Sequence, residues 1–299
     1  MLILRIISLF LVLSFVSCGK SYTEKSNNVT IKDDFGNEIV LGKTPSRIIS
    51  LAPSITETLY AIGADSLISG VTDYCDYPEQ AKYKKKVGGM IDPNLETIIS
   101  LNPDLILVSA EGNSQNTYQS LKNLGYKIFA SNPRNFDDVL KMVKNIGALT
   151  NHIFKADSVI NKMINQRSNI LSKVKNLKTD TCFILISLTP LMTASKNTFI
   201  NEIINYSGFY NLYSDELIPY PEINLEDILR KKPEYIIYPA NIKDPINLEK
   251  SILNIRKILK LNSNYSTTRI LIIDENLIFR PGPRMMEASE QLLYKRLNQ

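Results

Sequence analysis

The sequence is poor in the residues that most often perform catalysis or bind metals. Its 299 residues include one histidine, His152, and three cysteines, Cys18, Cys75 and Cys182, with no Cys-x-x-Cys pair. A transition-metal site is therefore disfavoured, because such sites gather several His and Cys ligands. A Ser-His-Asp or Cys-His arrangement would have to use His152, which lies far along the sequence from Cys75 and Cys182. We therefore expect neither an enzyme nor a bound metal.

Nucleotide-binding loops are also absent. The sequence contains neither G-x-x-x-x-G-K-[ST] nor G-x-G-x-x-G, so it has no glycine-rich loop to hold phosphate with backbone N–H groups. The net charge of +5 would suit a nucleic-acid partner, but the lysines are interspersed with acidic residues and the one dense run is KYKKK at 82–86. We interpret that run as a solvated face, and we expect no nucleic-acid partner and no cofactor.

The first eighteen residues, MLILRIISLFLVLSFVSC, have the pattern of a secretory signal: Arg5, an apolar run, and a small residue directly before Cys18. Cleavage before a cysteine resembles the processing of a bacterial lipoprotein, although Phe15 stands where a leucine is more usual. An uncleaved anchor is the alternative, but a transmembrane helix needs about 20 apolar residues. We predict a lipoprotein signal peptide over 1–18, a lipidated Cys18, and a flexible tether over 19–28, which has no apolar periodicity.

Strands and helices alternate along the rest of the chain, whose length and 44% hydrophobic content suit two globular domains. Alternation with short helices implies parallel sheets with crossover helices. We predict an N-terminal α/β lobe over 29–149 that begins with a β-hairpin over 29–41. Within it, the segment 47–64 is expected to form a strand, a turn and a helix capped by Ser54 or Thr56. Further strands are predicted at 67–73, 104–109 and 126–131, and further helices at 94–101 and 118–125.

A long helix is expected to connect this lobe to a second one. The apolar residues between 150 and 178 have helical spacing with no Gly or Pro, and at 1.5 Å per residue that helix would be about 40 Å long. The alternation then resumes over 179–299. We therefore predict a bridging helix over 150–178 and a C-terminal α/β lobe over 179–299. An oxidising compartment permits a disulfide between Cys75 and Cys182, but the sequence does not supply their geometry, and we favour two unpaired thiols.

One element occurs twice. NLETIISLNPDLILV at 94–108 and NLEDILRKKPEYIIY at 224–238 are identical at six of fifteen positions, and the register is kept throughout. Each copy reads as a helix, a turn that contains proline, and a strand. The two copies stand at equivalent points of the two predicted lobes. We interpret them as matching elements of two similarly built halves.

Five segments together resemble the substrate-binding proteins of ABC importers for iron-siderophores, haem and cobalamin. They are RIISLAPSITETLYAIGA (47–64), GVTDYCDYPEQA (70–81), VGGMIDPNLETI (87–98), NPDLILV (102–108) and FRPGPR (279–284). The likeness covers roughly 29–299 in order, and TDYCDYP makes the cobalamin-binding members the most similar. It implies two Rossmann-like α/β lobes joined by a single long helix, with a ligand cleft between them. Together with the signal pattern over 1–18, it leads us to expect an extracytoplasmic monomer, lipid-anchored on the periplasmic side or cell surface, that delivers a corrinoid to an ABC permease dimer.

The resemblance also assigns residues to the cleft. The ligand-binding positions of the family fall here on Ala52, Pro53, Ser54, Tyr74, Met90, Ser109, Met192, Tyr220, Asn276 and Arg280. Tyr74 and Tyr220 could lay their rings against a flat macrocycle, and the planar fork of Arg280 could bind an amide or acid on its rim. The alternative interpretations are ordinary packing for the tyrosines and a surface salt bridge for the arginine.

The chain departs from the cobalamin-binding pattern in one respect. Those proteins typically line the cleft with tryptophan, and this sequence has none. Met90, Ser109 and Tyr220 stand where tryptophan would be expected. A smaller and softer wall keeps a corrinoid possible and makes haem or a ferric siderophore more competitive. With His152 away from every cleft segment, tyrosine would be the axial ligand of a haem.

The paired segments carry a second expectation. In the family, one exposed carboxylate on each lobe docks into arginine pockets of the permease, and the matching residues here are Glu96 and Glu226. The alternative is that each merely stabilises the first turn of its helix, where a carboxylate contributes about 0.3–1 kcal/mol. Both hold if Asn94 and Asn224 cap the helices and leave the glutamates pointing outward. A lipoprotein that kept the fold for interaction without transport is a further alternative.

Overall fold

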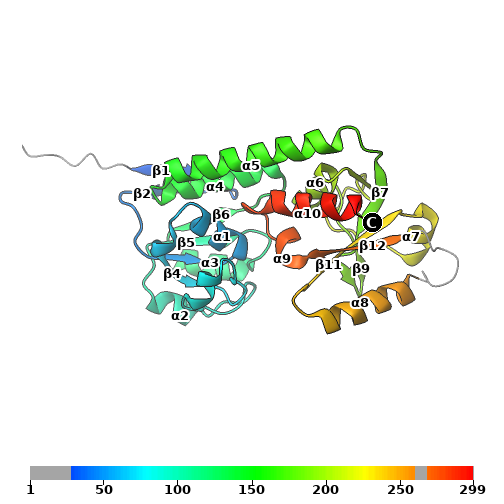
Figure 1. Ribbon diagram of the computed structural model, residues 1–299. Helices are drawn as coiled ribbons and strands as arrows, with labels where there is room; N and C mark the ends of the chain where they lie inside the picture. The colour runs from blue at the N-terminus through cyan, green and yellow to red at the C-terminus, as the bar shows by residue number, and fades with distance from the viewer. Residues whose placement is uncertain (1–27, 260–267, 299) are drawn as a thin grey trace, which may run out of the picture.

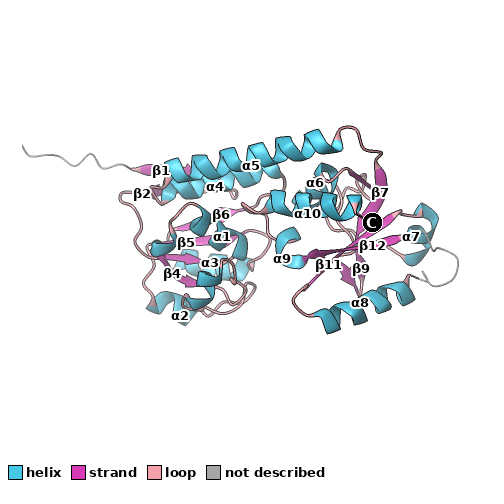
Figure 2. Cartoon of the chain, viewed as in Figure 1, coloured by secondary structure: helices cyan, strands magenta, loops and turns pink. Residues whose placement is uncertain are grey.

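The computed structural model describes residues 28–259 and 268–298, which form two lobes joined by one long helix (Figure 1, Figure 2). Each lobe contains a four-stranded sheet whose strands all run parallel. The two-lobed α/β architecture predicted from the sequence is confirmed. The predicted signal peptide over 1–18, with Cys18, and all but the last residue of the tether over 19–28 lie outside the described residues. Within those residues, no helix is both long and apolar enough to cross a membrane.

The N-terminal lobe begins with the expected hairpin, in which β1 (Val29–Lys32) pairs antiparallel with β2 (Glu38–Leu41). Its sheet has the order β4-β3-β5-β6. The strands are β3 (Ile48–Ser50), β4 (Ile68–Val71), β5 (Leu105–Ser109) and β6 (Ile128–Ser131). The helices are α1 (Pro53–Ala61), α2 (Leu95–Ser100), α3 (Gln115–Asn123) and α4 (Phe136–Leu149), with short 3-10 turns at Asp65–Leu67 and Glu79–Tyr83.

The C-terminal lobe has a sheet of order β10-β7-β11-β12 and a small antiparallel pair, β8 with β9. The strands are β7 (Asp180–Ile184), β8 (Ser187–Leu188), β9 (Leu191–Met192), β10 (Phe209–Asn211), β11 (Tyr235–Ala240) and β12 (Arg269–Asp274). The helices are α6 (Phe199–Tyr206), α7 (Leu225–Lys231), α8 (Pro245–Ile258), α9 (Glu275–Ile278) and α10 (Met285–Leu297).

The central strands of the N-terminal sheet are short aliphatic runs that are buried on both faces. Every residue of β3 and β6 is buried, as are the first four residues of β5. Strands of a parallel sheet are expected to be apolar throughout, because crossover helices cover both faces. Successive side chains of β5 accordingly enter different clusters: Leu105 and Leu107 lie in the core shared with α4 and α5, while Ile106 and Val108 pack on the opposite face.

The repeated element folds the same way in both lobes, as α2 followed by β5 and as α7 followed by β11. Asn94 and Asn224 cap the two helices, since each Oδ1 accepts a hydrogen bond from the backbone N–H three residues later, at 2.7 and 2.8 Å. Both copies also place a left-handed residue directly before the proline: Asn102 with φ 45° and Lys232 with φ 47°. A left-handed residue followed by proline ends a helix sharply. The equal distance from the Asn cap to the proline in the two copies therefore reflects the same turn.

The bridging helix is α5 (Ile153–Val174), a helix of 22 residues, about 33 Å long. It buries three residues spaced by seven, Ala156, Met163 and Ile170. This stripe belongs to one hydrophobic cluster that extends from the N-terminal lobe through α5 to the C-terminal lobe. The strut is therefore part of a continuous core, which favours small relative motions of the lobes over a wide hinge movement.

Helix α4 was not predicted as a separate element, and it packs against α5 through the turn at 150–152. The approach is close: a side-chain carbon on Gly147 would lie 2.4 Å from the Ala156 Cβ atom. The predicted helix over 150–178 is correspondingly shorter at both ends. Asn151 has a left-handed φ of 61°. This conformation interrupts the helix after α4, so α5 begins only at Ile153.

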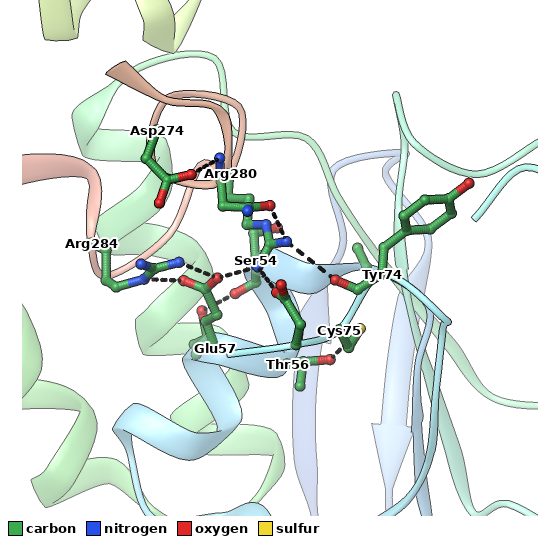
Figure 3. A network of polar contacts seen from close by, with 12 residues as sticks. Ser54, Thr56, Glu57, Tyr74, Cys75, Asp274, Arg280 and Arg284 are labelled. Atoms are coloured by element: carbon green, nitrogen blue, oxygen red, sulfur yellow. Dashed lines mark hydrogen bonds and ion pairs between the residues drawn. The ribbon is translucent and has the colours of Figure 1, made fainter. Parts of the chain in front are cut away.

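A charge cluster of Glu57, Asp76, Arg280 and Arg284 joins the lobes. Figure 3 labels three of its members, Glu57, Arg280 and Arg284. Glu57 on α1 accepts hydrogen bonds from Arg280 Nη1 at 2.9 Å and from Arg284 Nε and Nη2 at 2.8 and 2.7 Å. Its side chain is only 2% exposed. Arg284 also lies over the ring of Tyr77, 3.7 Å from the centroid. These charge-assisted contacts hold the segment 280–284 against the N-terminal lobe.

A second contact between the lobes involves Glu202 on α6. Its carboxylate accepts the backbone N–H of Phe136, the first residue of α4. The Phe136 ring packs edge-on against Tyr206, with centroids 6.1 Å apart, and under the guanidinium of Arg167 at 4.2 Å. Burial raises the pKa of Glu202, although the bond from Phe136 opposes that shift. The two lobes are thus joined by polar contacts at both places.

We predict that Glu57→Gln lowers the free energy of unfolding by about 3 kcal/mol, because it leaves two arginines near the interior with one carboxylate. Urea denaturation at neutral pH measures the change. The matched control is Glu79→Gln, which removes the same charge from the exposed pair with Lys82, whose side chains are 67% and 43% exposed. That control should change stability by less than about 0.5 kcal/mol. Equal small losses for both variants would contradict the role assigned to Glu57.

Candidate functional site: a cleft between the lobes

A cavity of about 650 Å³ lies between the lobes and is lined by residues from both. All ten residues assigned to the cleft from the sequence line it: Ala52, Pro53, Ser54, Tyr74, Met90, Ser109, Met192, Tyr220, Asn276 and Arg280. The sequence did not indicate the remaining lining residues, which are Glu111, Gly112, Ile186, Phe199, Ile200, Glu275, Phe279 and Pro281. The volume lies within the range of about 300–1,000 Å³ that is usual for small-molecule sites.

The turn 52–54 enters the cleft at the carboxyl end of β3, where α1 begins. Ala52 is the N-cap and Pro53 opens the helix, with no side chain capping it. The expected capping by Ser54 or Thr56 is therefore wrong. The Thr56 hydroxyl instead donates to Ser50 Oγ at 2.8 Å. The first-turn N–H groups of α1 have no side-chain partner, and they lie at a wall of the cavity, where they can meet a ligand oxygen.

Asn113 organises three segments of the N-terminal wall, although sequence reasoning missed it. Its amide Nδ2 donates to the backbone oxygens of Leu51 at 2.9 Å and Met90 at 2.7 Å. Its Oδ1 accepts the backbone N–H of Ser109 at 2.7 Å. One buried side chain thus fixes the positions of the turn 52–54, Met90 and Ser109. No local sequence signal identifies it, because its partners lie as far as 62 residues away.

The two tyrosines of the cleft differ in environment. Tyr74 is 60% exposed, and its ring points away from the charge cluster (Figure 3), so ordinary core packing does not explain it. Tyr220 is partly buried against the main core. Burial, and then the carboxylate of Glu111, raise the pKa of its phenol. Because Glu111 belongs to the N-terminal lobe and Tyr220 to the C-terminal lobe, these two groups face each other across the cleft.

The predicted ligand-binding fork of Arg280 is already occupied by protein groups. Nη1 donates to Glu57 at 2.9 Å and to Asp76 at 2.8 Å. Nη2 donates to the Tyr74 backbone oxygen at 3.2 Å and to the Asn276 side chain. Each terminal nitrogen of a guanidinium carries two hydrogens, so these four bonds use them all. With its side chain 10% exposed, Arg280 also does not form the surface salt bridge considered as its alternative role.

The charges of the cleft are therefore balanced or negative. Among the described residues that line it, the ionisable side chains besides tyrosine are Glu111, Glu275 and Arg280. Glu111 pairs at 3.3 Å with Arg134, which does not line the cavity. Arg280 is neutralised by the charge cluster. No cation of the described lining is left to meet an anionic ligand.

The histidine and the two described cysteines lie outside the cleft lining. His152 precedes α5, and its Nδ1 is 2.7 Å from the backbone oxygen of Thr150. Cys75 and Cys182 are both buried and unpaired, as expected. Burial raises the pKa of both thiols, which disfavours the reactive thiolate. Within residues 28–259 and 268–298, no three His, Cys, Asp or Glu side chains gather to hold a metal.

Glu96 and Glu226 occupy the same position in the first turns of α2 and α7, and both are exposed. In the described part of the chain, neither forms an ion pair within 4.0 Å. Figure 1 shows the two helices on different lobes. The asparagine caps leave both carboxylates free to project from the surface.

Comparison with known proteins agrees with this geometry. The chain is 30% identical to the vitamin B12-binding protein of Pectobacterium atrosepticum, over 83% of this chain and 87% of that protein. It is 31% identical to the uncharacterized ABC transporter substrate-binding lipoprotein YvrC of Bacillus subtilis, over 88% of this chain and 84% of the other. The crystal structure of the periplasmic vitamin B12 binding protein BtuF of Vibrio cholerae superposes with a TM-score of 0.70 at 25% identity, covering 84% and 96% of the two chains.

The profile of the family described as periplasmic binding protein matches residues 48–250, more than half of the chain. The matched segment includes most of the cleft residues, α5 and both copies of the repeated element. The resemblance inferred from the sequence is thereby confirmed at the level of the family, and so is the expectation that the protein is not an enzyme. This chain belongs to the periplasmic binding protein family of ABC importers.

Proposed function

We propose that this protein is a lipid-anchored, extracytoplasmic substrate-binding protein that captures a cobalamin-like corrinoid as a monomer and delivers it to an ABC permease. The observation that carries the proposal is the cleft itself. It combines tyrosine and methionine side chains with polar groups at the rim, and its described lining offers no uncommitted cation. The vitamin B12-binding names of relatives that cover most of the chain support the same ligand class.

A corrinoid suits these walls. Its macrocycle presents a flat apolar face and a rim of neutral carboxamides. The rings of Tyr74 and Tyr220 can contact that face, and the thioethers of Met90 and Met192 can adapt to its contour. The uncapped N–H groups of α1 and the hydroxyl of Ser109 can bond rim amides, which carry no charge that would need a cation.

Haem is the main alternative, and the cleft suits it less well. Haem carries two propionates, and its iron takes a His, Cys, Met or Tyr ligand. The described lining has no His or Cys, although it includes Met90 and Met192, and its arginine is committed to carboxylates. The raised pKa of Tyr220 opposes the phenolate that a tyrosine ligand requires. Tyr74, exposed at the cleft, and the thioethers of Met90 and Met192 are the groups that would favour haem.

Membrane attachment through Cys18 follows from the signal pattern over 1–18. The lipoprotein name of the Bacillus subtilis relative supports it. The open cavity of about 650 Å³ also favours transport over an interaction lipoprotein, for which a collapsed cleft would be expected. The division into an N-terminal lobe over 29–149, a bridging segment over 150–178 that contains α5, and a C-terminal lobe over 179–299 remains part of this proposal.

We expect isothermal titration with cyanocobalamin and dicyanocobinamide to show micromolar or tighter binding. Tyr74→Ala should weaken it about tenfold, because an aromatic face is lost from the wall. Tyr83→Ala is the matched control: Tyr83 is 83% exposed and does not line the cleft, so affinity should not change. An absence of any corrinoid response at micromolar concentration would remove the basis of the proposal. A Soret shift with haemin that a Tyr74 or Tyr220 substitution abolishes would decide for haem.

Delivery is expected to depend on Glu96 and Glu226. In the double variant Glu96→Ala, Glu226→Ala, corrinoid affinity should match the wild type, because both residues lie outside the cleft lining. Corrinoid uptake by cells should fall at least about tenfold, since paired surface carboxylates are lost from the proposed permease contact. The control is Glu79→Ala with Glu249→Ala, which removes one exposed acid from each lobe elsewhere. Equal uptake by both double variants would refute the docking role.

A further inference from the structure

We propose that Asp76 determines the charge specificity of the cleft by neutralising Arg280, so that ligands with a neutral rim are accepted and ligands with a carboxylate rim are disfavoured. This inference rests on the proposed binding function and deepens it. Asp76 itself does not line the cavity. It acts on the ligand through the arginine that does.

Two carboxylates, those of Glu57 and Asp76, together neutralise Arg280 and Arg284. Glu57 binds Arg280 at 2.9 Å and Arg284 at 2.7 Å, so one carboxylate serves two guanidinium groups. Asp76 Oδ1 accepts the other hydrogen of Arg280 Nη1 at 2.8 Å. Two arginines are thus balanced by two carboxylates only because Asp76 takes part. Without the charge of Asp76, the cluster next to the cleft would carry a net charge of +1.

Because the charge cluster is largely buried, a change in its net charge alters the electrostatic potential in the cleft. The side chains of Glu57, Arg280 and Arg284 are 2%, 10% and 13% exposed, and charges shielded from water interact more strongly than exposed ones. Asp76 is the accessible member, at 35%. Burial raises its pKa, but the hydrogen bond and the charge of Arg280 outweigh this and lower it. Asp76 is therefore ionised at neutral pH.

At Asp76, a substitution can remove the negative charge without removing the hydrogen-bond acceptor for Arg280. It lies in the loop after β4, between Tyr74 and Tyr77, both exposed. In Asp76→Asn, the amide oxygen can still accept the bond from Arg280 Nη1, while the negative charge is lost. The fold contact through Glu57 and Arg284 is untouched. Asp76→Glu keeps the charge and serves as the conservative variant.

The test compares two ligands that differ by one rim charge: cyanocobalamin and its monocarboxylic acid, in which a peripheral amide is hydrolysed. Both are titrated calorimetrically into the wild type, Asp76→Asn, Asp76→Glu and the control Asp73→Asn. Asp73 is an exposed acid of the same loop that forms no ion pair within the described chain. The wild type should bind the acid about tenfold more weakly than the amide. Asp76→Asn should reduce the ratio of the two dissociation constants, acid over amide, about tenfold. Asp76→Glu should restore this ratio, and Asp73→Asn should leave it unchanged.

A ratio that Asp76→Asn does not change, or that Asp73→Asn changes equally, would overturn the inference. Thermal unfolding followed by circular dichroism establishes that each variant is folded. If no corrinoid binds, the proposed ligand is wrong, and haemin with its dimethyl ester provides the same comparison. If Asp76→Asn then binds haemin more tightly than the wild type does, and binds the dimethyl ester no more tightly, the role of Asp76 is supported. An unchanged affinity for haemin, or no binding of either compound, would overturn it.

Discussion

The carboxylate of Glu57 is the contact on which the arrangement of the cleft most depends. It is nearly inaccessible to water and binds two arginines from the segment that follows α9. Because Glu57 lies on α1 and the arginines lie in the C-terminal lobe, this contact sets where the wall containing Asn276 and Arg280 stands relative to the turn 52–54. A buried carboxylate is tolerable only when its partners are held in place. A side-chain carbon on Gly282 would lie 3.4 Å from the Ser54 backbone oxygen, in ordinary van der Waals contact, so this segment packs directly against the turn 52–54.

The same contact changes the chemical character of the cleft. An arginine that lines a binding site usually suggests an anionic ligand. Here both terminal nitrogens of the guanidinium are bound by Glu57, Asp76, Asn276 and a backbone oxygen, so the arginine has a structural role and its charge is neutralised by carboxylates. A periplasmic binding protein with such a wall suits a large neutral ligand held by aromatic and thioether contacts. The continuous core through Ala156, Met163 and Ile170 favours small movements of these walls.

Local patterns in the sequence predicted much of the secondary structure and of the two-lobed fold. Alternating strands and helices, the asparagine caps of α2 and α7, and the long helix α5 each follow from neighbours in the chain. The ten cleft positions came from family resemblance, and they do meet around one cavity. Contacts between distant residues could not be read in the same way. Asn113 bonds Leu51 across 62 positions, and Arg280 reaches Glu57 across 223. The capping of α1 was predicted wrongly because Pro53 starts that helix ahead of both serine and threonine candidates.

The central claim is that a neutral corrinoid lies between the lobes while Arg280 stays bound to its carboxylates. A crystal structure of the protein with cyanocobalamin tests it most directly. The account predicts the macrocycle against Tyr74 and Tyr220, with Arg280 still within hydrogen-bond distance of Glu57 and Asp76. A ligand bound elsewhere, or an Arg280 that has left both carboxylates to bind it, would contradict the account.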